Sequence, residues 1–290
     1  MTAQVLTWAL GELAKRHTVV LASVLNTSGS VPGKTGARLA MTSDGHLWTG
    51  TVGGAGLEHR VLTRCRELLV SSSEPTAEVI TYGLNKGAKG YEVTPLDSLC
   101  GGRVTISIEV MIPMPHVLIM GGGHCGEALS GLLVRLGWSY SVHDTRSEFA
   151  SRELYPDAVE RSSSTVEAFF ANEDATSLRR FSDVLLLGHD WSEDEARLLS
   201  LLQRMQQAGI QPDGQDGPRI GVIGSRSKWQ AFEATCRKEG IEQSMLDGVI
   251  CPIGLNIGAQ SPEEIAVAVA AQIMAKHKGI EPGEGTWRQS

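Results

Sequence analysis

The second half of the chain alternates continuous apolar runs with longer segments of mixed polarity. The apolar runs are 116–120, 139–143, 182–187 and 219–223. Runs without polar alternation are typical of parallel strands that are buried on both faces. Segments of helical length, including 125–136 and 192–208, separate these runs. The pattern therefore predicts βαβ units and a Rossmann-like, doubly wound parallel sheet.

The first part of the chain has a different, mixed pattern. Helical periodicity covers 4–15 and 56–70, and strand-like runs cover 18–25, 37–42, 46–52, 77–82 and 102–110. The runs on either side of Ser43-Asp44-Gly45 predict a hairpin, because Asp-Gly is a strong turn signal. A smaller mixed α+β domain is therefore expected before the Rossmann-like domain, which makes the whole chain an α/β protein.

Prolines mark the expected domain boundary. Pro113 and Pro115 disfavour both a helix and a central strand, so the chain between them should be an extended linker. We therefore predict an N-terminal domain over 1–112, a C-terminal domain over 116–278 and a flexible tail over 279–290. A final helix should begin after Ser261, with Pro262 in its first turn and Glu264 completing a capping box.

Composition narrows the class of protein. An apolar content of 41% with 20% charged residues predicts a globular protein with a proper core. The net charge of −7 disfavours nucleic-acid or anionic-membrane partners, and no apolar run reaches the roughly 18 residues of a membrane helix. Five scattered cysteines without a CxxC spacing favour reduced thiols in the cytoplasm over a zinc finger or a disulfide framework. The first residues also lack the pattern of a signal peptide.

A glycine-rich turn follows the apolar run that ends at Met120. Gly121-x-Gly123-His124-x-Gly126 has the GxGxxG form of a dinucleotide-binding turn, in which backbone N–H groups and the helix dipole receive a phosphate. Asp144 ends the next run, where such sites place a carboxylate on a ribose. Arg146 could accept a second phosphate, pair with Asp144 or remain a surface cation. The alternative for the whole turn is tight packing of a helix on a strand.

A second glycine turn, Gly224-Ser225-Arg226, precedes another helix. It combines a hydroxyl and a guanidinium, with the Lys228 ammonium close behind, and could hold a further phosphate; helix capping with surface charge is the alternative. His189-Asp190 follows a third apolar run and could contact a ligand, although Asp190 could equally cap a helix. Parallel strands should bring these turns to one sheet edge.

The first domain offers weaker signals. Its Gly29–Arg38 loop carries two cations, Lys34 and Arg38, but lacks the spacing of a Walker phosphate loop. Cys100 is flanked by glycines, which makes its thiol accessible, although a lone cysteine is more often a small buried side chain. Near the other end, the 252–259 loop contains two glycines and could close over a ligand.

Taken together, these motifs resemble the XdhC/CoxI family of accessory proteins for molybdenum hydroxylases. In the first domain they are Gly29-Ser30-x-Pro32, Gly36-Ala37-Arg38, Gly53-Gly54 with Glu58, and Cys100-Gly101-Gly102. In the second domain they are Gly121-x-Gly123-His124, Asp144-x-Arg146, His189-Asp190, Gly221-x-x-Gly224-Ser225-Arg226 and Pro252–Ala259 followed by Pro262-x-Glu264-Ile265-Ala266. The resemblance extends over nearly the whole chain.

The resemblance implies a maturation chaperone and not a metabolic enzyme, so no catalytic residue is assigned. Such a protein binds molybdenum cofactor and delivers it, after sulfuration, to an apo-hydroxylase of the xanthine dehydrogenase type, with a cysteine desulfurase as a further partner. The expected cofactor contacts are Gly121, Gly123, His124, Gly126, Asp144, Arg146, His189, Asp190, Gly224, Ser225, Arg226, Cys100 and Arg38. A metal ligand is not assigned. A homodimer is expected because two-fold dimers are the commonest assemblies.

The chain departs from the family pattern at three positions. Gly56 stands where many relatives have a cysteine, which leaves Cys100 as the better candidate for a thiol contact. Asn256 replaces an aspartate, and Gly188 replaces a threonine before His189. These changes weaken the expectation of a sulfur-handling role while leaving cofactor binding in place.

Two other functions fit parts of the pattern. The GxGxxG turn would serve an NAD(P)-dependent oxidoreductase equally well, with His189 as its acid or base. A nucleotide-sensing regulator would need a DNA-binding module, and the acidic chain shows neither a clear helix-turn-helix nor a basic stripe. The resemblance favours the maturation factor over both.

Overall fold

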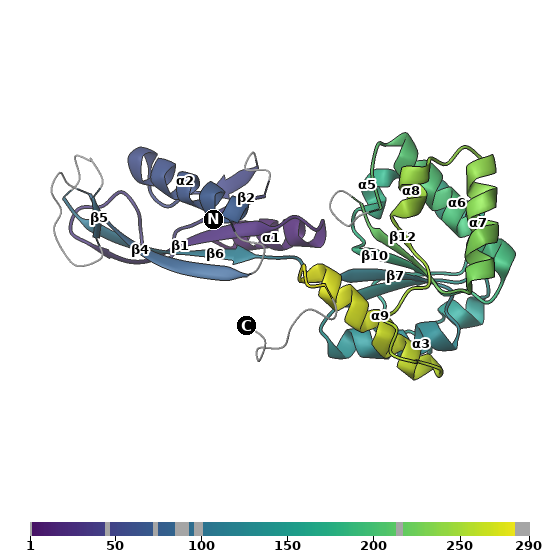
Figure 1. Ribbon diagram of the computed structural model, residues 1–290. Helices are drawn as coiled ribbons and strands as arrows, with labels where there is room; N and C mark the ends of the chain where they lie inside the picture. Colours follow the sequence, from purple (N-terminus) through teal and green to yellow (C-terminus); the bar gives the residue numbers. More distant parts are fainter. Residues whose placement is uncertain are drawn as a thin grey trace, which may run out of the picture. The chain divides into compact units, whose positions relative to one another are not determined.

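Two sheets, each with its own helices, organise the chain in the computed structural model (Figure 1). The chain divides into two compact units, Met1–Pro113 and Met114–Ser290. The structure describes residues 2–43, 47–71, 75–84, 93–95, 101–212 and 217–281. The predicted turn at Ser43-Asp44-Gly45 lies partly outside these ranges, and the predicted tail lies mostly outside them.

The N-terminal unit contains a six-stranded, largely antiparallel sheet with the order β3-β2-β1-β6-β4-β5. Its strands are β1 (Val19–Ser28), β2 (Arg38–Thr42), β3 (Trp48–Gly50), β4 (Thr76–Gly83), β5 (Val93–Pro95) and β6 (Arg103–Met111). The exception to antiparallel pairing is β5, which runs parallel to β4. The predicted hairpin is confirmed in its pairing, because β2 and β3 are antiparallel neighbours.

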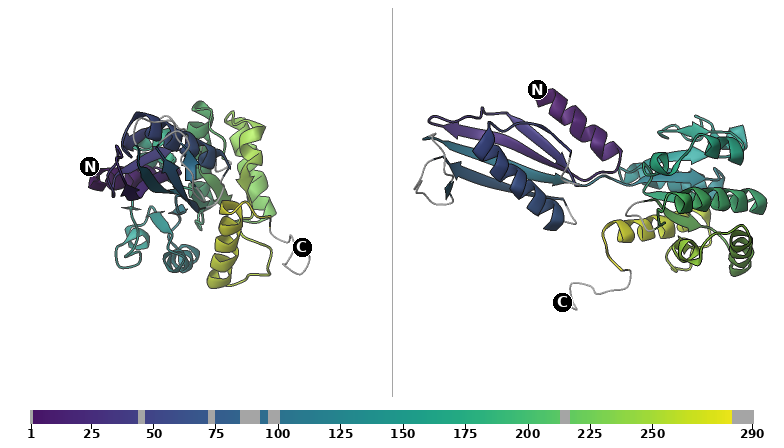
Figure 2. Two further views of the ribbon diagram at one scale, coloured as in Figure 1. Left: turned by 90° about the vertical axis from the view of Figure 1, so that its left-hand side faces the viewer. Right: turned by 90° about the horizontal axis from the view of Figure 1, so that it is seen from above.

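Two helices pack on this first sheet, and each belongs to a separate apolar cluster. The helix α2 (Ala55–Ser71) contributes Leu57 and Val61 to a core that includes Val20, whereas α1 (Thr2–Ala14) contributes Val5 to a core that includes Val19. Successive strand residues point to opposite faces, so α1 and α2 lie on opposite faces of the sheet. The view from above in Figure 2 shows α2 lying across the strands.

The C-terminal unit contains a six-stranded sheet with the order β12-β11-β10-β7-β8-β9, and every neighbouring pair is parallel. Its strands are β7 (His116–Met120), β8 (Ser139–His143), β9 (Arg161–Ser162), β10 (Asp183–Leu186), β11 (Arg219–Val222) and β12 (Val249–Ile250). Its helices are α3 (His124–Arg135), α4 (Val166–Ala171), α5 (Ala175–Leu178), α6 (Trp191–Gln207), α7 (Arg226–Lys238), α8 (Gln243–Asp247) and α9 (Pro262–His277), with a short 3-10 helix at Ser147–Ala150.

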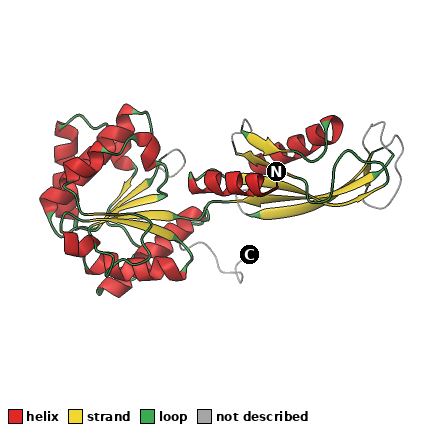
Figure 3. Ribbon diagram, turned by 180° about the vertical axis from the view of Figure 1, so that it is seen from behind, coloured by secondary structure: helices red, strands yellow, loops and turns green. Residues whose placement is uncertain are grey.

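Helices cover both faces of this second sheet (Figure 3). The strand β7 shows the division, because Leu118 and Met120 belong to the core beneath α6 and α7, whereas Val117 and Ile119 belong to the core beneath α3 and α9. A strand buried on both faces has no polar alternation, which is why β7 and β8 have the bounds that their apolar runs predict. The predicted α/β class with a doubly wound parallel sheet is confirmed.

The strand order places a topological switch between β7 and β10. The chain proceeds from β7 to β8 and β9 on one side, then returns to β10, β11 and β12 on the other. In such sheets, ligands bind in the crevice outside the carboxyl ends of the strands at this point. None of the described helices has both the length and the apolar character that a membrane span requires.

Candidate functional site

The carboxyl ends of four central strands lie in register at one edge of the C-terminal sheet. Met120 pairs with His143 on one side and with Leu186 on the other, and Leu186 pairs with Val222. Every residue that the sequence predicted for the C-terminal site follows one of these four positions by one to six residues. The structure therefore brings the predicted turns to a single edge.

Each glycine of the first turn has its own steric reason. Gly121 has a φ of +110°, and a Cβ atom there would lie 2.5 Å from the Gly188 nitrogen. A Cβ atom at Gly126 would lie 2.7 Å from the Gly121 carbonyl oxygen, so this glycine lets α3 approach the strand. A Cβ atom at Gly123 would meet no atom within 4 Å. The first and third glycines serve the protein's own packing, and the second faces open space.

Among the described residues, no side chain caps the amino end of α3. Its N-cap residue is Gly123, whereas Asp190, Ser225 and Ser261 accept hydrogen bonds from first-turn N–H groups of α6, α7 and α9. The first N–H groups of a helix have no partner within the helix, and they carry the positive end of its dipole. His124, the first residue of α3, is exposed. This end of α3 is therefore suited to receive an anion.

Asp144 ties this turn to the end of β8. Its carboxylate accepts hydrogen bonds from the Gly122 backbone N–H at 2.9 Å, from the Arg146 backbone N–H at 3.0 Å, and from Nε and Nη2 of Arg146 at 2.9 Å each. Burial opposes ionisation, but these hydrogen bonds from Arg146 and Gly122 outweigh it and hold the pKa of Asp144 below its usual value. Of the alternatives for Arg146, the structure shows the pairing with Asp144.

The Asp144 carboxylate is nearly inaccessible in this arrangement, with 1% of the residue exposed. A ribose hydroxyl would have to displace Arg146 in order to bond with it. Arg146 itself remains about one third exposed and is stacked on Phe149, with its central carbon 3.8 Å from the ring centroid. The exposed part of this guanidinium, held by Asp144 and Phe149, is the cation that this turn presents at the surface.

In the second glycine turn, two polar side chains make hydrogen bonds within the protein and a third is exposed at the surface. The Ser225 hydroxyl accepts a hydrogen bond from the Lys228 N–H at 3.3 Å and so caps α7. The Lys228 ammonium is buried and donates to Asp194 and to the Ile223 carbonyl oxygen, so its charge is paired inside the protein. Arg226 is exposed and makes no side-chain hydrogen bond or ion pair with the described residues. Arg226 is therefore the available cation of this turn.

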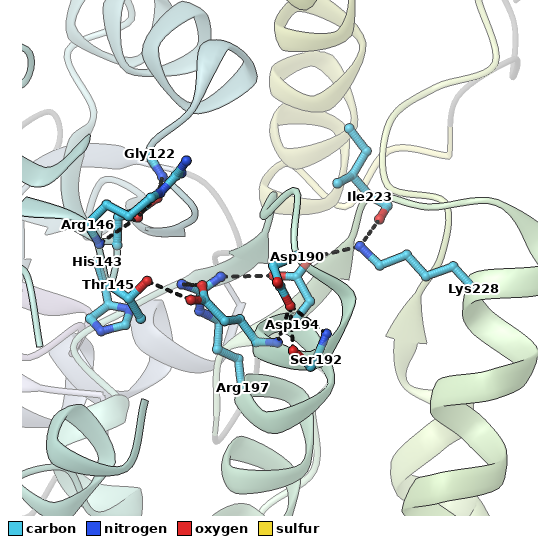
Figure 4. A network of polar contacts seen from close by, with 12 residues as sticks. Gly122, His143, Thr145, Arg146, Asp190, Ser192, Asp194, Arg197, Ile223 and Lys228 are labelled. Atoms are coloured by element: carbon cyan, nitrogen blue, oxygen red, sulfur yellow. Dashed lines mark hydrogen bonds and ion pairs between the residues drawn. The ribbon is translucent and has the colours of Figure 1, made fainter. Parts of the chain in front are cut away.

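A buried ionic network lies beneath these turns (Figure 4). Asp194 on α6 accepts hydrogen bonds from Lys228 at 2.8 Å and from Arg197 at 3.0 Å, and all three side chains are at most 6% exposed. Arg197 also donates to Glu193 at 3.0 Å, and Glu193 accepts from the Thr145 hydroxyl at 2.6 Å. The network joins α6 to α7 and to the turn after β8, so it fixes three segments of the site edge relative to one another.

Two atoms next to this network are buried without a hydrogen-bond partner among the described residues: Nδ1 of His143 and Nε of Arg197. The other ring nitrogen of His143 lies 3.0 Å from the Ser164 carbonyl oxygen, which requires a proton on Nε2 in the neutral ring. Burial, followed by the charge of Arg197, lowers the pKa of His143 to about 4. No sequence motif indicates a role for His143, Asp194 or Arg197.

His189 and Asp190 lie at the same edge, after β10. Asp190 caps α6 by accepting hydrogen bonds from the N–H groups of Ser192 at 2.8 Å and Glu193 at 3.1 Å. The capping alternative for Asp190 is therefore confirmed. His189 is exposed, and its contact with a ligand stays a prediction.

The glycine-containing loop 252–259 lines a cavity of about 610 Å³. The other lining residues are Ile223 and Gly224 after β11, and Ile265 and Ala268 on α9. Most of these side chains are apolar, and the volume lies within the range of small-molecule sites. The cavity begins at the second glycine turn and can hold a flat organic group there.

Two predicted contacts belong to the N-terminal unit. Arg38 lies on β2, where it lines a separate cavity with Lys34. Cys100 lies outside the described residues, so its predicted role stays untested. Within the described ranges, no group of three or more His, Cys, Asp and Glu side chains gathers in a way that could hold a metal ion.

Comparisons with known proteins identify two family models in the chain. The model described as the XdhC Rossmann domain matches residues 117–273, and the model described as the XdhC and CoxI family matches residues 12–83. The first match corresponds to the C-terminal sheet and its helices, from β7 into α9.

Two curated relatives are similar to most of the chain. An Escherichia coli protein, "Uncharacterized protein YqeB", is 27% identical over 263 residues, which cover 91% of this chain and 44% of that protein. A Bacillus subtilis protein, described as a probable subunit of xanthine dehydrogenase, is 25% identical over 179 residues, which cover 60% of this chain and 46% of that protein. The chain thus spans less than half the length of these relatives.

Among solved structures, a protein described as a xanthine dehydrogenase from Bacillus halodurans is similar to the chain. It is 17% identical, with a TM-score of 0.46, and the match covers 97% of this chain and 98% of that one.

Proposed function

The chain belongs to the XdhC and CoxI family, and from this premise we propose that it binds molybdenum cofactor and delivers it to a hydroxylase of the xanthine dehydrogenase type. Its role is that of an accessory protein without turnover of its own. The family assignment and the description of the Bacillus subtilis relative support the choice of partner. A cysteine desulfurase that sulfurates the cofactor is a further proposed partner.

The observation that carries the binding proposal is the open amino end of α3. Gly123 supplies no side chain to cap the helix, and no other atom occupies the space where its side chain would stand. The cofactor's pterin carries a phosphate, and its dinucleotide forms carry two. A phosphate at the amino end of α3 would accept hydrogen bonds from the first N–H groups of the helix. It would also interact favourably with the helix dipole.

The residues near α3 suit the other parts of the molybdenum cofactor. Arg226, whose guanidinium has no partner among the described residues, can bind a second anionic oxygen. The cavity of about 610 Å³ beside Gly224 has the size and the largely apolar lining that suit a flat pterin ring. When bound, the cofactor supplies the molybdenum centre that the target hydroxylase needs. The chain's part is to hold the phosphates and to exclude water from the ring.

Holding the cofactor in this way requires a rigid edge. Asp144 fixes the first glycine turn through the Gly122 N–H, and the Asp194–Lys228 pair fixes the start of α7 relative to α6. A site whose supporting groups are already hydrogen-bonded loses less entropy when the ligand binds. Such a site favours retention of the ligand until a partner protein displaces it.

One observation favours a second function, an NAD(P)-dependent oxidoreductase. The three glycines have the steric roles of a dinucleotide-binding turn, with Gly121 in a tight turn, Gly123 open and Gly126 in close packing. Against it, both Asp144 oxygens are already occupied by Arg146 and Gly122, so the usual ribose acceptor is not free. We therefore retain it as the alternative.

Anaerobic binding by the purified protein tests the proposal. Molybdenum cofactor freshly released from a molybdenum hydroxylase, NAD⁺ and NADP⁺ are titrated separately, with retained molybdenum and the fluorescence of the oxidised pterin as readouts for the first. Tight retention of the cofactor with negligible NAD(P)⁺ binding is expected. NAD(P)⁺ binding without retained molybdenum or pterin would reject the proposal in favour of the oxidoreductase.

Two variants of nearly equal size place the phosphate. Gly123→Asp puts a carboxylate at the α3 N-cap and Gly123→Asn puts a neutral amide there, and both side chains enter open space. If a phosphate binds at α3, Gly123→Asp should bind the cofactor at least about tenfold more weakly than Gly123→Asn, because only the carboxylate repels it. Equal affinities would exclude α3 as the phosphate site. Delivery is then tested by activation of a purified apo-hydroxylase with the loaded protein.

A further inference from the structure

The N-terminal unit contains a cavity of its own, of about 540 Å³. It is lined by residues 32–38, which lead from the loop after β1 into the first residue of β2, by Gly50 at the end of β3, and by Thr51 and Gly53 before α2. Its volume falls within the range of sites for small organic ligands. Of its lining residues, Arg38 is among the cofactor contacts expected from the sequence, and the proposed cofactor site in the other unit includes none of them.

Close backbone contacts build the wall of this cavity. A Cβ atom at Gly33 would lie 2.3 Å from the Val52 carbonyl oxygen, and one at Gly53 would lie 2.3 Å from the Gly33 Cα atom. Gly53 also has a φ of +126° and Gly50 a φ of +85°, which other residues rarely adopt. The two loops therefore touch through bare backbone, and these glycines contribute no side chains to the wall.

The charges that line the cavity are positive. Lys34 and Arg38 both line it, and neither makes a side-chain hydrogen bond or an ion pair with the residues that the structure describes. The carboxylate of Glu58 bonds with the Thr51 hydroxyl, which also accepts a hydrogen bond from the Gly53 N–H at 3.2 Å. Glu58 thus holds the Thr51 side of the wall in place, and neither cation has a counter-ion in the described part of the chain.

The helix α2 adds to this positive potential. It begins at Ala55, two residues after the lining residue Gly53, so the positive end of its dipole lies at the rim of the cavity. Two cations and a helix amino end beside a cavity of nucleotide size suit a dianionic phosphate carried on a small organic group.

We propose that this cavity is a second binding site, specific for a phosphate monoester of mononucleotide size. Lys34 and Arg38 neutralise the phosphate, and the glycine-walled loops contact the remainder of the ligand. All of its lining residues belong to the N-terminal unit, whereas α3 belongs to the C-terminal unit.

The test uses the full chain and guanosine 5′-monophosphate as the probe, with guanosine and inorganic phosphate as comparison ligands in calorimetric titrations. All measurements are made in the Gly123→Asp background, which closes the phosphate position at α3. The variant K34Q/R38Q removes both cations from the cavity. The control R60Q/R66Q removes two exposed cations of α2 that do not line the cavity, so the change in net charge is matched.

We expect one site for the nucleotide in the Gly123→Asp background, weakened at least about tenfold by K34Q/R38Q and by much less in R60Q/R66Q, because charge-assisted hydrogen bonds are lost only in the former. Guanosine should bind at least about tenfold more weakly than its monophosphate for the same reason. The absence of binding in this background, or equal weakening by the two double variants, would overturn the proposal. Inorganic phosphate that binds as tightly as the nucleotide would contradict a ligand of nucleotide size.

Because the two sites are disabled by different variants, the outcomes for the two proposals are separable. Loss of molybdenum cofactor binding in Gly123→Asp, with nucleotide binding intact, supports both. Loss of nucleotide binding in K34Q/R38Q, with no cofactor binding in the unmodified chain, supports the second site and rejects the proposed function.

Discussion

The Lys228 ammonium lies 2.8 Å from Asp194 Oδ2, with the two side chains 6% and 0% exposed. The other oxygen of the same carboxylate accepts a hydrogen bond from Arg197 at 3.0 Å. One buried carboxylate therefore stands between two buried cations and connects α6 with α7. Burying charges is costly unless they are paired. Both cations need the carboxylate of Asp194, whereas Asp194 would keep one partner if either cation were removed.

This arrangement predicts unequal effects of removing its members. Asp194→Asn leaves Lys228 and Arg197 as buried cations without a shared counter-ion and should lower the free energy of unfolding by about 3–5 kcal/mol. Lys228→Met leaves Asp194 paired with Arg197 and fills a similar volume, so its effect should be clearly smaller. Urea denaturation of both variants measures the difference.

The exposed pair between Glu233 and Arg237 on α7 provides the control, with Arg237 52% exposed. Glu233→Gln should change the free energy of unfolding by about 0–1 kcal/mol, because solvent screens the pair. If Lys228→Met proved as damaging as Asp194→Asn, the carboxylate would not be the centre of the network.

The glycines of the first turn should differ in how they tolerate a side chain. In Gly126→Ala, the new Cβ atom lies 2.7 Å from the Gly121 carbonyl oxygen and 3.1 Å from Ile119, so α3 must move away from the strand. We expect a loss of about 1–3 kcal/mol. Gly123→Ser enters open space and can cap α3, so it should not destabilise the protein.

Thermal unfolding of the two variants measures this contrast. Gly126→Ala should lower Tm by several degrees, at about 2–4 °C per kcal/mol for a unit of this size, and Gly123→Ser should leave it unchanged or slightly higher. An equal decrease in both would mean that Gly123 also serves packing, and the steric distinction between the glycines would be wrong.

The parts of this fold that could be predicted from sequence are those that a local pattern specifies. The strands β7 and β8 are continuous apolar runs, and their predicted bounds are confirmed. The capping box at Ser261 and Glu264 is likewise confirmed, because its residues are close together in sequence. By contrast, the two-residue strands β9 and β12 are too short to produce a pattern, and they form only because a neighbouring strand is already present.

The candidate site was predictable in its location but not in its internal contacts. The glycine turns and their shared edge follow from strand periodicity and from parallel topology. The burial of Asp194 and Arg197 does not, because charged residues three apart on a helix usually lie on its solvated face. The burial of Lys228 does not follow from a local pattern either, because its partner Asp194 is 34 positions away in sequence.

Arg226 should contribute to ligand binding and not to stability. Its side chain is exposed and makes no hydrogen bond or ion pair with the described residues, so Arg226→Ala removes none of their contacts. If the guanidinium holds a phosphate, the variant should weaken molybdenum cofactor binding by about 1.5–3 kcal/mol, measured by the anaerobic titration. Arg135→Ala removes an exposed cation at the opposite end of α3 and is the matched control. Unchanged affinity in Arg226→Ala would remove this residue from the site.

His143 should make the stability of the C-terminal unit depend on pH. Its ring is fully buried, and its pKa of about 4 in the folded protein lies below the value of about 6.5 in an unfolded chain. Between these two values the unfolded chain binds one more proton than the folded one, so stability rises with pH and is lost as pH falls from about 6.5 toward 4. The expected contribution to the slope approaches about 1.4 kcal/mol per pH unit.

His143→Gln isolates this contribution. Glutamine can still donate to the Ser164 carbonyl oxygen but does not titrate. Urea unfolding at a series of pH values should therefore show a flatter profile between about pH 4.5 and 6 for the variant, whatever its stability at neutral pH. His189→Gln replaces an exposed histidine at the same sheet edge and should retain the steep profile. Parallel profiles for His143→Gln and the unmodified protein would show that His143 is protonated in the folded state, and its Nδ1 would then have to carry the proton.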